Sequence, residues 1–123
     1  MKTKNIFLIL GTANVILGAI LYFGAEEISI AAGVSDSGLL EATYGRMALG
    51  GSIAGQGLLT LFLRNLTGQG AKNALLGYVV AGVLQMVVIL SRICTDENYA
   101  APFALIVPVF FLIALAFYGS RKA

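Results

Sequence analysis

The sequence contains no histidine and only one cysteine. Histidine is the commonest metal ligand and the commonest general base near neutral pH, so its absence removes the main support for a metal site or an acid–base enzyme. The single Cys94 excludes both an intrachain disulfide and a C-x-x-C redox pair. A glycine-rich phosphate-binding loop is also missing. We therefore expect a protein without catalytic residues, bound metal or cofactor.

Charged residues are also scarce. They make up 11% of the 123 residues, whereas an ordinary soluble domain carries about 25%. Hydrophobic residues make up 59%, and the mean hydropathy is +0.90. A small domain has a large surface for its volume, and this chain cannot cover such a surface with polar groups. The composition predicts a lipid bilayer as its surroundings. The net charge of +2 comes from scattered residues, so nucleic acid is not an expected partner.

Long apolar runs predict an all-α protein, a single membrane domain over residues 1–123. A bilayer core of about 30 Å requires about 20 helical residues per crossing. We predict four transmembrane helices, over residues 6–23, 40–63, 74–93 and 100–118, in an antiparallel up-and-down bundle. Residues 64–73 are predicted to form a polar loop, and 28–32 a short interfacial helix. Pro108 lies inside the last predicted helix, where its missing N–H predicts a kink.

The first apolar run could also be a secretory signal peptide, because Lys2 and Lys4 precede it. At about 18 residues it is longer than most signal-peptide cores, and Phe23 would be an unfavourable residue close to a cleavage site after Ala25. We therefore interpret the run as a retained transmembrane helix.

The charges separate between the two sides of the predicted bundle. One side holds six of the eight basic residues: Lys2, Lys4, Arg64, Lys72, Arg121 and Lys122. The other holds all six acidic residues: Glu26, Glu27, Asp36, Glu41, Asp96 and Glu97. Three or five helices would mix these charges. The positive-inside rule then predicts cytoplasmic N- and C-termini, and we expect the bacterial inner membrane as the location.

Arg46 and Arg92 are the two basic residues on the acidic side, each just inside a predicted helix end. Tyr78, Gln85 and Arg92 recur every seven residues and so share one helix face. Ionisable residues within a membrane are costly, which makes these four side chains a candidate site for an anion or a polar headgroup. Alternatively, the arginines extend to the membrane surface and pair with acids there, Arg46 with Glu41 and Arg92 with residues 96–97. For Asn14, in the middle of the first predicted helix, we expect a hydrogen bond to a neighbouring helix.

The second predicted helix is rich in small residues. It contains Gly51-x-x-x-Gly55 with Ala48 on the same face, and Gly77-x-x-x-Ala81 repeats the pattern in the third. Small residues allow helix backbones to approach closely in lipid. We predict a helix-packing interface at these five positions, either within the chain or with another chain.

A series of short motifs resembles one family. The segment LLEATYGRMALG at 39–50 is followed by Ser91-Arg92, the acids at 96–97 and Pro102. In this order the chain resembles an uncharacterised bacterial family of small four-helix membrane proteins related to the DoxX-like group. Members typically show Tyr-Gly-Gly at the start of the second helix and an arginine near the outer end of the third. Tyr44-Gly45 and Arg92 match, and Arg46 replaces the second glycine. The resemblance implies the four-helix fold.

Two functions of different classes agree with these features. The first is an accessory or scaffold subunit of a larger membrane complex, which fits the missing catalytic residues, the short loops and the glycine-rich helix. The second is a homo-oligomeric small transporter or channel for an anionic or polar solute, which would use Arg46, Arg92, Gln85 and Tyr78. We expect the first, with the lipid bilayer and other membrane protein chains as partners, in a hetero-complex or a homo-oligomer.

Overall fold

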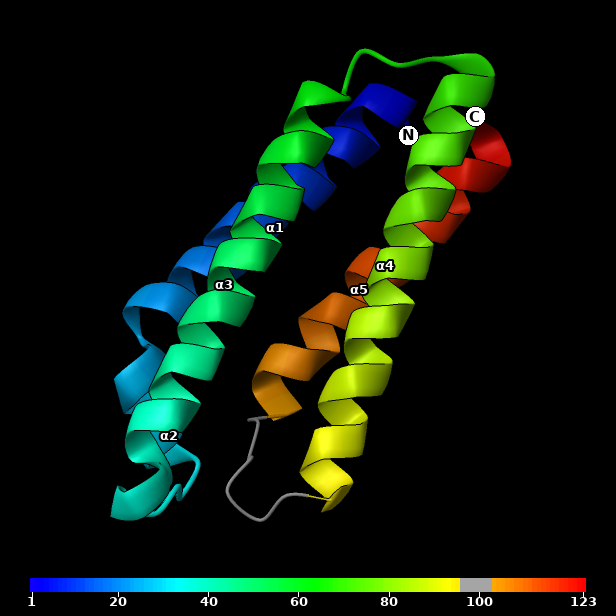
Figure 1. The fold of residues 1–123 in the computed structure, drawn as a ribbon. Helices are drawn as coiled ribbons and strands as arrows, with labels where there is room; N and C mark the ends of the chain where they lie inside the picture. The colour runs from blue at the N-terminus through cyan, green and yellow to red at the C-terminus, as the bar shows by residue number, and fades with distance from the viewer. Residues whose placement is uncertain (96–102) are drawn as a thin grey trace.

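The computed structural model describes the backbone of residues 1–95 and 103–123, and the side chains of residues 1–91 and 106–123. The described residues form α1 (Thr3–Phe23), α2 (Ala25–Ala31), the 3-10 helix η1 (Asp36–Gly38), α3 (Leu39–Phe62), α4 (Gly68–Thr95) and α5 (Phe103–Lys122). This confirms the all-helical prediction for the described part of the chain. The long helices run alternately in opposite directions, so both termini and the α3–α4 connection lie at one end and α2 at the other (Figure 1).

Among the described residues, two helices are long and apolar enough to cross a membrane: α1, and Gly68–Ser91 of α4. Only 33% and 22% of the residues in their most apolar windows are buried within the molecule. The apolar core helix of a soluble protein would be mostly buried, because water disfavours exposed apolar surface. Both helices instead leave most of the residues in these windows unburied.

Two helix ends lie at least four residues from their predicted positions. α4 begins at Gly68 rather than at residue 74, so the predicted polar loop over 64–73 is correct only for residues 64–67. Gly68 has a φ of +61°, a conformation that glycine adopts easily, and the helix starts there. The polar side chains of Gln69, Lys72 and Asn73 are exposed, whereas Ala71 is buried. Polarity in this segment marks the exposed face of a helix.

At the C-terminus, α5 continues to Lys122 rather than ending at residue 118, and it runs through Pro108. The acidic residues 96–97 and the predicted start of this helix at residue 100 lie outside the described residues. The connection after α1 contains the expected short helix, which is α2 and begins at Ala25.

Glycines bring α1 and α3 into direct backbone contact. A Cβ atom added at Gly18 would lie 2.5 Å from the Gly50 carbonyl oxygen, and one at Gly50 would lie 2.6 Å from the Gly18 carbonyl oxygen. Two turns away, a Cβ at Gly57 would lie 2.7 Å from the Gly11 carbonyl oxygen. Each helix contributes two glycines seven residues apart, and these lie on one face. The two helices therefore pack as one tight pair.

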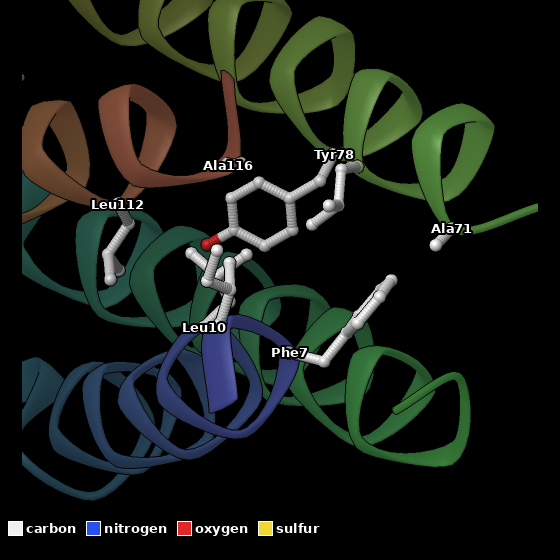
Figure 2. Packing of buried hydrophobic residues seen from close by; sticks show 8 residues of the cluster. Phe7, Leu10, Ala71, Tyr78, Leu112 and Ala116 are labelled. Atoms are coloured by element: carbon white, nitrogen blue, oxygen red, sulfur yellow. The ribbon is translucent and has the colours of Figure 1, made fainter. Parts of the chain in front are cut away.

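The second pair consists of α4 and α5. Gly82 of α4 faces Ile113 of α5, and a Cβ there would lie 2.7 Å from that side chain. A hydrophobic core, shown in Figure 2, joins the two pairs. Its residues lie in the parts of α1, α4 and α5 near the end that holds the termini. It is built from residues of α1, α4 and α5: Ile6, Phe7, Leu10, Ala71, Leu75, Tyr78, Leu112 and Ala116.

The adjacent glycines 50 and 51 provide a matched test of the α1–α3 contact. Gly50→Ala should lower the unfolding free energy by about 1–3 kcal/mol, because the new methyl group would collide with the α1 backbone. Gly51→Ala should leave stability unchanged or raise it, because nothing lies within 4 Å of its added Cβ and alanine favours helix. The measurement is the unfolding transition of each variant in detergent, monitored by circular dichroism. Equal effects of the two substitutions would contradict the glycine contact.

Candidate functional site

Polar side chains meet between helices at three levels of the bundle. At the first level, the Tyr78 hydroxyl of α4 donates to Asn14 Oδ1 of α1 over 2.8 Å, and both residues are buried. Figure 2 shows the Tyr78 ring among the apolar core residues, with its hydroxyl directed toward α1. Asn14, for which the sequence predicts an interhelical hydrogen bond, thus accepts one from α4.

At the second level, two glutamines connect α4 to α3. Gln85 Nε2 donates to Gln56 Oε1 over 3.1 Å, and the bond is partly buried. Lipid offers no hydrogen-bond partners, so side-chain amides on membrane helices tend to bond to one another across the helix interface.

At the third level, Arg46 of α3 lies under the short helix α2. Its side chain is 4% exposed, and Nη1 donates to Ser29 Oγ over 3.3 Å. The Ser29 hydroxyl in turn donates to the Ala25 carbonyl oxygen over 2.8 Å, within α2. An arginine that extended to the membrane surface would expose its guanidinium, whereas that of Arg46 is covered. Glu41, which the sequence suggests as the partner of Arg46, is exposed.

The residues of the predicted anion or headgroup site therefore lie at different levels instead of surrounding one point. Tyr78 and Gln85 are seven residues apart on α4, which corresponds to about 10 Å along the helix. Arg46 and Gln56, the partner of Gln85, are ten residues apart on α3, or about 15 Å. The Arg92 side chain lies outside the described residues. What the described residues form is a ladder of interhelical polar contacts.

Chemically, this ladder offers a phenol, three neutral amides, one guanidinium and one serine hydroxyl. Within the part of the chain whose side chains are described, no group of three or more His, Cys, Asp or Glu residues could hold a metal ion. The amide and phenol contacts can fix how the helices are rotated against one another, because any other rotation would leave them unpaired in an apolar environment.

The predicted small-residue interface faces outward. A Cβ added at Gly51, Gly55 or Gly77 would have no other atom within 4 Å, and Ala48 is exposed. Ala81 is half-buried. Within the described part of the chain, packing against other residues of the chain is therefore the wrong alternative for the three glycines. The packed face of α3 carries Gly50 and Gly57 instead, because adjacent residues point about 100° apart on a helix.

Two contact residues, Gln56 and Ser29, are not among the sequence predictions. Gln56 pairs with Gln85, and Ser29 holds Arg46. Gln56 could have been found as a strongly polar residue inside an apolar helix. Ser29 carries no such signal, because serine is common in connections.

Comparison with known proteins adds no assignment: no protein-family model, curated protein or solved structure matches this chain. The functional argument therefore depends on the contacts and surfaces of the chain itself.

The Asn14–Tyr78 bond can be tested with phenylalanine substitutions. Tyr78→Phe should lower the unfolding free energy in detergent by about 0.6–1.7 kcal/mol, the usual range for interhelical hydrogen bonds in membrane proteins. Tyr44→Phe is the control, because Tyr44 is 61% exposed and should show no loss. If both variants unfold like the wild type, the bond does not contribute to the stability of the bundle.

Proposed function

We propose that this chain is a small integral membrane protein that acts by helix–helix contact, as an accessory or scaffold subunit of a larger membrane complex. The observation that carries the proposal is the division of the α3 glycines between two faces. The face with Gly50 and Gly57 packs against α1, whereas the face with Gly51 and Gly55 is exposed along the apolar surface of the molecule.

The membrane location is supported by the outward orientation of the apolar side chains. Phe23, Phe62 and Phe111 are each more than 70% exposed, and they come from three different long helices. Exposed apolar surface of this extent is unfavourable in water and favourable in lipid. The tight packing of α1 against α3 also favours a retained helix over a cleaved signal peptide, since removing α1 would uncover the α3 glycines.

The proposed topology has four crossings by α1, α3, α4 and α5. The end that holds both termini carries six basic residues, and among the described residues the acids lie at the other end, around α2. The positive-inside rule then favours cytoplasmic termini, in the bacterial inner membrane. α3 is less apolar than α1. Its polar residues Arg46 and Thr60 are buried and face protein rather than lipid, so α3 can still cross the membrane.

The contact surface of the proposal is the outward face of α3 around Ala48, Gly51 and Gly55, with Gly77 and Ala81 of α4 as a second small-residue face. A helix from another chain could approach the α3 backbone there as closely as α1 does on the opposite face. The partner we propose is a transmembrane helix of a different polypeptide, because the chain's own tight glycine pairing is already satisfied internally.

The test is purification from membranes in mild detergent, followed by mass spectrometry of the intact assembly. We expect a partner of different sequence in fixed stoichiometry. Gly55→Leu should release that partner, because the larger side chain would hold the helices apart. Val83→Leu on the exposed face of α4 is the control and should retain it.

A second function, a homo-oligomeric transporter or channel for an anionic or polar solute, has one observation in its favour. Arg46 is buried, and the Thr43 hydroxyl one turn away is buried with no hydrogen-bond partner among the described residues. Purification of a homo-oligomer alone, with solute flux in liposomes that Arg46→Ala abolishes, would support this function and contradict the accessory role.

A further inference from the structure

The end of the molecule that holds both termini contains an open hollow of about 480 Å³. Three segments far apart in the sequence line it: the first residues of the chain, the α3–α4 connection and the end of α5. Four of its lining residues are cationic, namely Lys2, Lys4, Arg64 and Lys122, and none is acidic. The fold thus gathers half of the eight basic residues around one cavity.

Two of these cations are held in place by neighbouring groups. Arg64 Nη1 donates to the Leu61 carbonyl oxygen over 2.9 Å, and Lys122 Nζ lies 4.9 Å from the centre of the Tyr118 ring. Neither contact neutralises a charge, so both residues keep their attraction for an anion. Like charges brought together without acids destabilise a protein unless a bound anion offsets their repulsion.

A shallow, wide-open apolar groove on the surface of α1 begins one helical turn beyond the hollow. It is lined by Leu8, Ile9, Thr12, Ala13 and Ile16 on the outer face of α1. Lys4 of the hollow and Leu8 and Thr12 of the groove are spaced four residues apart, so they form a continuous row along the helix. A cationic hollow followed by an apolar groove has the shape and polarity of a phospholipid, with its phosphate at one end and its acyl chain at the other.

We infer that the hollow binds the phosphate of an anionic phospholipid whose acyl chain lies along the α1 groove. Lysine and arginine side chains donate charge-assisted hydrogen bonds to phosphate oxygens, and basic pockets on the cytoplasmic side of membrane proteins bind anionic headgroups in this way. The groove favours a lipid over a free phosphate compound, which would leave it empty. This inference depends on the membrane location proposed above.

The test is native mass spectrometry of the detergent-purified protein, titrated with phosphatidylglycerol and with phosphatidylcholine of the same acyl chains. We expect preferential retention of phosphatidylglycerol. Lys122→Gln and Lys4→Gln should each weaken it about fivefold, since one basic residue near a membrane surface contributes about 1 kcal/mol. Lys72→Gln is the matched control. Lys72 is exposed, is predicted on the same side and loses the same charge, but it does not line the hollow. Circular dichroism verifies that all variants are folded.

Three results would overturn the inference: equal retention of the two lipids, equal weakening by Lys72→Gln and Lys122→Gln, or displacement of the lipid by millimolar inorganic phosphate. The last result would assign the hollow to a free phosphate-bearing ligand. Extraction of membranes with alkaline carbonate separates this inference from the proposed location. A chain released by carbonate would contradict membrane integration itself, whereas a chain retained without lipid preference would contradict only the lipid site.

Discussion

The backbone contact between α1 and α3 is the interaction on which the rest of the structure depends. Gly11 lies against Gly57, and Gly18 lies against Gly50. A Cβ added at any of the four would come within 3 Å of the opposite helix. In lipid the hydrophobic effect does not drive helices together, so association depends on dispersion contacts and hydrogen bonds at close range. Glycine is the residue that permits such an approach.

This contact determines where the polar side chains of α3 lie. Arg46 and Thr60 share the packed face with the two glycines, so the pairing that brings the backbones together also buries these residues. α2 then covers Arg46 through Ser29. Gln56 lies toward α4, where it meets Gln85. The α1–α3 pair therefore presents polar groups to the α4–α5 pair, and the Asn14–Tyr78 bond and the apolar core complete the connection.

Composition and charge predict the helical class, the approximate positions of the helices and, for the described residues, the end of the bundle at which each charge lies. They do not predict which face of a helix packs. In a soluble protein, one apolar face and one polar face reveal the rotation of a helix, but a helix surrounded by lipid is apolar on both. Gly50 and Gly51 show the consequence, because they are adjacent and chemically identical, and only the structure separates the packed one from the exposed one. The early start of α4 was missed for the related reason that a polar exposed face resembles a loop.

The proposed role in helix–helix contact is tested most directly by photocrosslinking in intact membranes. Leu59, one turn after Gly55, and Val87 of α4 are 59% and 58% exposed, so they are matched for accessibility. With a photoreactive amino acid at position 59, we predict adducts to a second polypeptide. At position 87 we predict adducts to lipid alone. Lipid adducts alone at both positions would contradict the proposal that α3 offers its small-residue face to another chain.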